Sequence, residues 1–193
     1  MRSNFDDCLT LTLRAEGGFV DEAADPGGAT NMGITRATLA GVRGHAVSKA
    51  DVRALTRAEA SEIYRTIYWS AVRADDLPAG VDAVVFDHAV NSGPKAAVRT
   101  LQNALGFQQD GLMSRRCLRA AQATDPATLV RDLCTLRMNF LKRLSTWLVF
   151  RRGWTARMET LERAALAMCV SAPKPEPASL QELSRAAAQT KEC

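Results

Sequence analysis

The segment 79–91, AGVDAVVFDHAVN, places the strongest limit on the folds open to this chain. Apolar residues fall on nearly every face of the helix that it would form, which is typical of a helix buried on all sides. Ser92, Gly93 and Pro94 follow, a combination that ends a helix. We therefore expect a fold organised around one central, buried helix.

The rest of the chain also carries mainly helical signals. Apolar residues at helical spacing predict a first helix that puts Glu16 on its core-facing stripe, at the C-terminal end, with Ser3 and Asp6 as a capping box at the start. Further helix starts or helices are predicted at 36–43 behind Thr35, at 48–51, from Thr56 to Trp69, at 97–105, at 115–122, from 126 to about 152, and at 154–168. Residues 19–20 and 32–34 suffice only for a small hairpin. The expected fold class is mainly α with that one β element.

Composition narrows the functional classes. The chain has 193 residues, of which 47% are hydrophobic and 24% charged, and its net charge is +4, so a soluble globular domain without a concentrated nucleic-acid-binding surface is expected. Five scattered cysteines and two histidines, with no CxxC pair, argue against a metal site. We expect Cys8, Cys117 and Cys134 to be core residues in a chain made in a reducing cytosol.

A glycine-rich loop with three notable polar residues follows the first helix. Glu16 would sit at the apolar end of a helix, where burial and the helix dipole both raise the pKa of a carboxyl group. Asp25 lies in a polar loop that would keep it ionised, and Thr30 on the returning arm could hold a water. Opposed carboxyl environments are typical of acid-catalysed glycoside cleavage. The alternative is a solvated helix end followed by an ordinary tight turn.

Two strings in this region, EGGF at 16–19 and DPGGATNMGIT at 25–35, resemble the N-acetylmuramidases of glycoside hydrolase family 108, relatives of the lysozyme superfamily. Residues 86–93 (FDHAVNSG) are similar to the family's buried helix and its exit, and 152–157 (RGWTAR) to its Gly-Trp-x-x-Arg signature. Residues 101–106 and Asp110-Gly111 resemble its peptidoglycan-binding region, although Ser114 and Cys117 stand where the family has Gly and Thr. The resemblance implies a lysozyme-like helical fold with a catalytic region at 1–93, a peptidoglycan-binding-like region at 94–170 packed in the same globule, and a linker and tail at 171–193.

The resemblance also implies an activity. Glu16 is the expected catalytic acid, with Asp25 as base or stabiliser and Thr30 beside them, cleaving the β-1,4 bond between N-acetylmuramic acid and N-acetylglucosamine. Asn31, Asn91 and Trp154 are the substrate-binding candidates, while capping of the buried helix is an equally good use of Asn91. His88 fits a core histidine better than a catalyst. A lytic transglycosylase, a catalytically silent peptidoglycan-binding accessory protein and a helical DNA-binding protein are the alternatives.

The expected partner is peptidoglycan, with no cofactor, no metal, no nucleic acid and no stable membrane insertion. The N-terminus lacks the continuous apolar stretch of a signal peptide, and no run approaches the roughly 18 apolar residues of a membrane span. We therefore expect synthesis in the cytoplasm and action in the periplasm or cell wall after assisted export. The expected export partner is a holin or a secretion machinery, and the expected role is cell lysis or wall remodelling during secretion.

Overall fold

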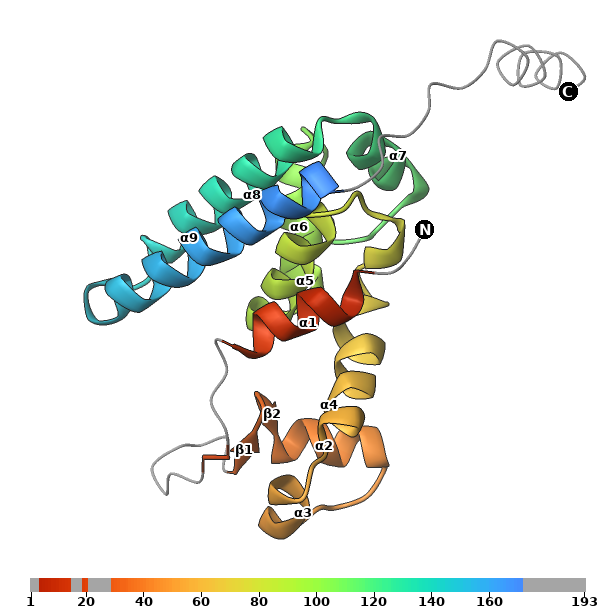
Figure 1. Cartoon of the computed structure of the whole chain (residues 1–193), viewed down its shortest axis with the longest axis vertical. Coiled ribbons are helices and arrows are strands. Elements are labelled where there is room, and N and C mark those ends of the chain that lie inside the picture. Colours follow the sequence, from red (N-terminus) through yellow and green to blue (C-terminus); the bar gives the residue numbers. More distant parts are fainter. Residues whose placement is uncertain (1–3, 15–18, 21–28, 172–193) are drawn as a thin grey trace, which may run out of the picture.

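The computed structural model describes residues 4–14, 19–20 and 29–171 (Figure 1). Within these ranges the chain is mostly helical, with one two-stranded antiparallel sheet, consistent with a lysozyme-like fold. The α-helices are α1 (Phe5–Leu13), α2 (Arg36–Arg43), α3 (Lys49–Arg53), α4 (Arg57–Tyr64), α5 (Val81–Ser92), α6 (Pro94–Ala104), α7 (Arg115–Ala123), α8 (Pro126–Leu141) and α9 (Trp147–Ser171). A π-helix, η1 (Arg65–Trp69), continues α4, and a 3-10 turn, η2 (Ala74–Asp76), precedes α5.

Helix α5 lies at the centre of the fold, as its sequence predicts. Residues on all its faces are buried, and it packs against α1, α6, α8, α9 and both short helical turns. Gly80, just before α5, has a φ of 86°, and a Cβ there would lie 2.3 Å from the carbonyl oxygen of Ala165 on α9. Only glycine therefore allows α9 to approach the start of α5 so closely.

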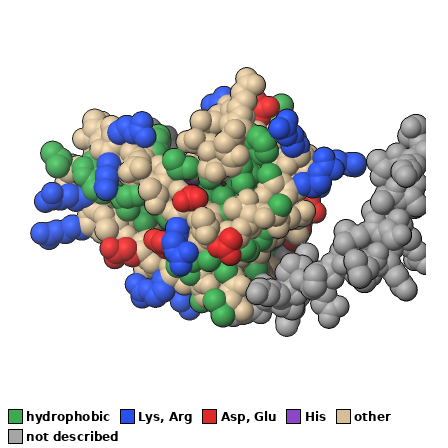
Figure 2. Space-filling view, turned by 90° about the horizontal axis from the view of Figure 1, so that it is seen from above, with side chains coloured by type: hydrophobic (Ala, Val, Ile, Leu, Met, Phe, Trp, Pro, Cys, Tyr) green, Lys and Arg blue, Asp and Glu red, His purple; other side chains and the backbone are tan. Residues whose placement is uncertain are grey.

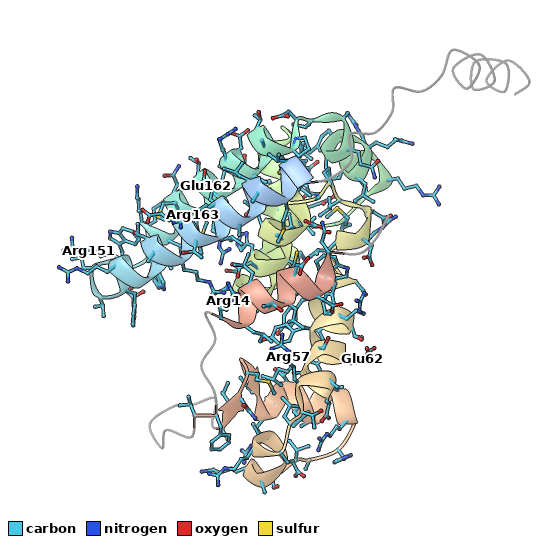
Figure 3. All side chains as sticks on the ribbon, viewed as in Figure 1. Arg14, Arg57, Glu62, Arg151, Glu162 and Arg163 are labelled. Carbon is cyan, nitrogen blue, oxygen red and sulfur yellow. The ribbon has the colours of Figure 1, made fainter. Side chains whose placement is uncertain are left out.

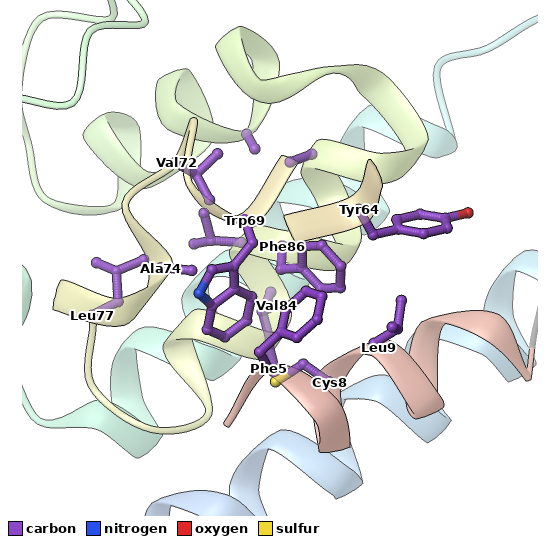
Figure 4. Close-up of a cluster of buried hydrophobic side chains, with 14 of the residues drawn as sticks. Phe5, Cys8, Leu9, Tyr64, Trp69, Val72, Ala74, Leu77, Val84 and Phe86 are labelled. Carbon is purple, nitrogen blue, oxygen red and sulfur yellow. The ribbon is translucent and has the colours of Figure 1, made fainter. Parts of the chain in front are cut away.

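Aromatic rings fill the core beside α5 (Figure 4). Phe86 of α5 makes edge-on contacts with Phe5 of α1 at 6.0 Å and with Trp69 of η1 at 5.3 Å between ring centroids. Phe5 and Trp69 are themselves 5.3 Å apart. The side chain of Trp69 is fully buried, so this ring serves the core rather than a sugar-binding surface. These contacts fix α1 against α5 and the end of α4.

The β element differs in position from the expected hairpin. Its strands are β1 (Thr30–Asn31) and β2 (Ile34–Thr35), with Thr30 opposite Thr35. Met32 and Gly33 form the turn with φ values of 49° and 74°, the left-handed pair that suits a two-residue hairpin. Val20 joins only as an isolated bridge to Thr30. The hairpin is thus tighter than predicted, because the turn lies within residues assigned to a strand.

The end of the chain's helical region also departs from expectation. We predicted one helix from 126 to about Gly153, but α8 ends at Leu141 and α9 begins at Trp147, so Trp147 belongs to the second helix. Backbone hydrogen bonds from Arg143 to Phe140 and from Leu144 to Leu141 close the turn between them. Helix α9 then runs through Gly153 and returns along α8 (Figure 1), which buries Met158, Leu161 and Ala165. Packing of the returning helix outweighs the helix-ending tendency of one glycine.

Several helix starts agree with the sequence. Thr35, Ser48, Thr56, Ser114 and Asp125 each cap the helix that follows through a side-chain oxygen. The N-cap of α1 is Asn4, which makes no side-chain capping bond and donates instead to Asp82 at 3.0 Å, while the predicted cap Ser3 lies outside the described residues. No helix in the described ranges combines the length and the apolar character needed to cross a bilayer.

Candidate active site

The predicted catalytic carboxyl groups, Glu16 and Asp25, both lie outside the described residues. Their chain neighbours are described: Arg14 ends α1 shortly before Glu16, and the paired residues Val20 and Thr30 stand on either side of the segment that holds Asp25. The surroundings of the site can therefore be built from α1, the β-hairpin and the helices that hold them.

Thr30 occupies the middle of three short extended segments. Its backbone N–H and carbonyl pair with those of Val20 at 2.9 and 2.8 Å, and in the hairpin it stands opposite Thr35. Both backbone polar groups are therefore engaged, and the side chain is half-buried. Thr30 is thus held rigidly where the segment containing Asp25 returns to the fold.

Three side-chain hydrogen bonds hold the hairpin against the helices around it. The amide nitrogen of Asn31 donates to the carbonyl oxygens of Val52 at 3.0 Å and Arg53 at 3.2 Å, at the end of α3. The hydroxyl of Tyr64 on α4 donates to the carbonyl oxygen of Met32 at 2.9 Å. Asn31 is buried and its N–H donors hold α3, so its observed role is structural; contact with substrate stays a prediction.

A pocket of about 250 Å³ opens beside the C-terminal end of α1. Leu11 and Arg14 of α1 form one side, and α9 forms the other with Ala156, Arg157, Thr160 and Leu161, while Asp87 of α5 lies at its base. Figure 3 shows Arg14 at this end of α1, below α9. The pocket therefore adjoins the residue from which the chain continues towards Glu16.

Asp87 is a buried carboxylate held by two arginines. Arg137 Nη1 on α8 lies 2.5 Å from Asp87 Oδ2, and Arg157 Nη2 on α9 lies 2.8 Å from Asp87 Oδ1. Burial by itself would raise the pKa of Asp87, but the charges and hydrogen bonds of Arg137 and Arg157 outweigh burial and hold that pKa below its usual value. Asp87 is thus an ionised structural group that joins three helices and is unsuited to donate a proton.

His88, the neighbour of Asp87 on α5, is buried and lacks the proton needed by an acid. Burial, with a further contribution from the charge of Arg137, lowers the pKa of His88 to about 4, against the smaller opposing effect of Asp87. The imidazole is therefore neutral at neutral pH. This agrees with its interpretation as a core histidine.

The remaining substrate-binding candidates do not gather at the hairpin. Asn91 is exposed at the end of α5, where its amide donates to the backbone carbonyl of Asp87 at 2.8 Å. Trp154 lies on α9, half-buried, and stacks on Phe150 with centroids 5.5 Å apart. Both sugar-binding roles stay predictions, and the observed bonds give each residue a structural use.

Comparison with known proteins identifies the family to which this fold belongs. The sequence model described as Glycosyl hydrolase 108 matches residues 9–93, which include Glu16, Asp25, the hairpin and α5. The solved structure of Brucella abortus SagA is similar over 88% of this chain and 97% of its own, with 44% sequence identity and a TM-score of 0.80. The chain belongs to glycosyl hydrolase family 108. No curated protein matches it.

As a glycosyl hydrolase 108 member, the chain is a glycoside hydrolase, and the network around Asp87 joins two stretches that carried the resemblance. Asp87 comes from FDHAVNSG and Arg157 from RGWTAR, so these strings meet in space through an ion pair. Arg137 lies in neither string and was not singled out in the sequence analysis. The sequence indicates a buried role for Arg137 only through its position on the apolar stripe of α8, which also holds Leu133 and Cys134.

The turn resembling the family's peptidoglycan-binding region is built around Gln102. The side-chain nitrogen of Gln102 donates to Asp110 Oδ1 at 2.6 Å and to the carbonyl oxygen of Leu112 at 3.0 Å, and its oxygen accepts from the N–H of Gly111 at 2.9 Å. Ser114 then caps α7, and Cys117 is buried. This motif therefore shapes the turn itself, and binding of the cell wall there stays a prediction.

Asp82, at the start of α5, is a titratable group that the sequence analysis did not single out. It accepts hydrogen bonds from the N–H groups of Gly80 at 2.7 Å and Ala83 at 2.8 Å. Burial raises the pKa of Asp82 to about 6 despite these bonds. No group of three or more metal-ligating side chains gathers among the residues that the structure describes.

Proposed function

We propose that this glycoside hydrolase is an N-acetylmuramidase that cleaves the β-1,4 bond between N-acetylmuramic acid and N-acetylglucosamine in peptidoglycan. The observation that carries the proposal is the pocket at the end of α1. It adjoins Arg14, two residues before the predicted acid Glu16, inside the segment that matches the family. A pocket lined by a residue two positions before the predicted acid in the sequence offers a sugar a place to bind.

The chemistry assigns one step to each group. Glu16 donates its proton to the bridging glycosidic oxygen as the bond to the sugar's C1 carbon breaks. A water then adds to that carbon and loses a proton, either to Asp25 acting as base or, where Asp25 only stabilises the developing positive charge, to the carboxylate left on Glu16. The C-terminal end of α1 carries a partial negative charge, which favours the protonated form of a carboxyl group there.

Arg14 supports the choice of substrate class. Muramic acid and its stem peptide carry carboxylates, and the exposed guanidinium of Arg14 lies at the rim of this pocket. An arginine is suited to bind a carboxylate through paired hydrogen bonds. A neutral glycan would gain nothing from that charge.

The decisive experiment uses Glu16→Gln on purified peptidoglycan sacculi. This variant should no longer clear sacculi, while its circular dichroism and its binding to sacculi stay those of the wild type. Glu62→Gln, an exposed change on α4 with the same loss of charge, is the matched control and should keep full activity. Full activity of Glu16→Gln would remove Glu16 from the mechanism.

Mass analysis of the digested wall separates the alternatives. Reducing N-acetylmuramic ends identify a muramidase, and anhydro ends identify a lytic transglycosylase. Uncleaved glycan together with binding of the protein to sacculi identifies a catalytically silent accessory protein. Asp25→Asn should lower turnover, and Thr30→Ala should do so to a smaller extent.

The cellular setting is part of the same proposal. The enzyme would act on the periplasmic face of the wall after export through a holin or a secretion machinery, in lysis or in remodelling for secretion. Residues 1–93 would carry catalysis, and 94–170 would contribute wall binding. Fractionation of cells with and without the co-expressed export partner tests this setting.

A further inference from the structure

The turn between α8 and α9 projects from the end of the molecule and has an unusual surface. We name residues 140–154 the α8–α9 tip. Leu148 and Val149, at the start of α9, are each 75% exposed, and Phe140 and Phe150 are 47% and 51% exposed. Aliphatic side chains exposed to this degree and grouped on one projection usually mark a contact surface.

The tip also carries four cationic side chains and no acidic residue. Lys142, Arg143, Arg151 and Arg152 are all exposed within the tip. The sequence contains no acidic residue between Asp132 and Glu159. Figure 3 places Arg151 at the outer end of α9, and in Figure 2 Lys and Arg side chains gather around hydrophobic ones at that end of the molecule.

From this arrangement we propose that the α8–α9 tip docks peripherally on a membrane surface rich in anionic phospholipid. Leu148, Val149 and Phe150 would enter the boundary between headgroups and acyl chains. The four cations would meet lipid phosphates around them. Side chains of this kind anchor proteins in the interface without spanning the bilayer.

The aromatic rings of the tip support a lipid surface over a sugar. Trp154 contacts Trp147 with ring centroids 6.2 Å apart and stacks on Phe150 at 5.5 Å, so the two half-buried tryptophans pack against neighbouring rings rather than forming an open stacking platform. The most exposed side chains are aliphatic and cannot hydrogen-bond to hydroxyl groups. Tryptophan is also the residue typical of the membrane interface.

Charge argues against a second copy of the chain as the occupant. A symmetric dimer through the tip would place one cluster of four cations against another, with no acidic residue in the tip to pair with them. Like charges brought together at an interface are repulsive. An anionic bilayer complements the same cluster.

The test is co-sedimentation of the full chain with vesicles of phosphatidylglycerol and phosphatidylcholine in equal parts, compared with phosphatidylcholine alone. The wild type should bind the anionic vesicles and lose that binding in high salt. Leu148→Ser/Val149→Ser should bind at least about tenfold more weakly, because two apolar side chains no longer enter the interface. Leu112→Ser/Val170→Ser, which changes two exposed aliphatic residues elsewhere, should bind as the wild type does.

A second pair of variants isolates the charge. Arg151→Gln/Arg152→Gln should weaken binding roughly tenfold or more, since each cation near an anionic surface contributes on the order of 1 kcal/mol. Arg115→Gln/Arg119→Gln on α7 loses the same charge at exposed positions outside the tip and should bind as the wild type does.

Three outcomes would overturn the proposal. The first is equal sedimentation with and without anionic vesicles. The second is a dimer in analytical ultracentrifugation that Leu148→Ser/Val149→Ser dissociates. The third is binding to purified sacculi, but not to vesicles, that the tip variants abolish.

Discussion

Asp87 on α5 and Arg157 on α9 form a partly buried ion pair, with Oδ1 and Nη2 2.8 Å apart across 70 positions of sequence. The other oxygen of the same carboxylate binds Arg137 of α8. Asp87 and Arg157 both line the pocket beside α1, so this ion pair joins two of the helices that form its wall, α5 and α9. Structural integrity and pocket shape therefore depend on the same group.

Removing the charge of Asp87 should be costly. In Asp87→Asn the guanidinium of Arg137, which is 4% exposed, loses its counter-ion in the core, and the free energy of unfolding should fall by about 3–5 kcal/mol. Urea denaturation measures this loss. Asp76→Asn is the control, because its pair with Arg73 is exposed and should contribute less than about 1 kcal/mol. Equal losses in the two variants would contradict this account.

Asp82 and His88 should affect the pH dependence of stability in opposite directions. The folded pKa of Asp82, about 6, is above its ordinary 3.8, so its stabilising effect is present in acid and lost as pH rises through about 6. The folded pKa of His88, about 4, is below its ordinary 6.5, so stability is lost as pH falls from about 6.5 to about 4. Each effect is of order 3 kcal/mol.

Single variants should expose these two slopes. Asp82→Asn should lose more stability on acidification than the wild type, because the effect of His88 is then unopposed. His88→Gln should lose less stability on acidification than the wild type, because the opposing effect of His88 is removed while that of Asp82 is kept. Unfolding free energies measured from about pH 4 to pH 7 test both, and parallel curves for all three proteins would refute the compensation.

Two variants of Asn31, to Ala and to Asp, should separate support of the hairpin from contact with substrate. Loss of its two hydrogen bonds to the end of α3 should lower the free energy of unfolding by about 1–3 kcal/mol. If the residue acts only through support, Asn31→Asp, which loses the N–H donors and keeps the size, should lower stability and turnover together. A rise in KM with unchanged stability would instead indicate direct contact with the glycan.

Two glycines should respond to alanine in opposite ways. Gly153→Ala should stabilise the protein by up to about 1 kcal/mol, because Gly153 lies inside α9 with open space around its Cα. Gly80→Ala should destabilise it by more than about 2 kcal/mol, since the added Cβ would meet the Ala165 carbonyl at 2.3 Å in a left-handed backbone conformation. Shifts of the urea midpoint in the same direction would contradict the helix assignment at Gly153.

Local signals predicted much of the fold. The buried character of α5 and the caps at Thr35, Ser48, Thr56 and Asp125 could be read directly, because periodicity and capping act within a few neighbouring residues. The turn between α8 and α9 could not, because no glycine or proline marks residues 142–146. The continuity of α9 through Gly153 could not be predicted either, because it depends on packing along α8.

The sequence by itself determined the family and the helical class, and it led to the prediction of Glu16 and Asp25 as catalytic residues. Tertiary structure alone decided that Asp87, Arg137 and Arg157 share one buried site, that Asn31 holds α3, and that the pocket opens beside α1. The reason is physical: a helix cap or an apolar stripe is encoded by adjacent residues, whereas an ion pair between distant helices exists only where packing brings them together.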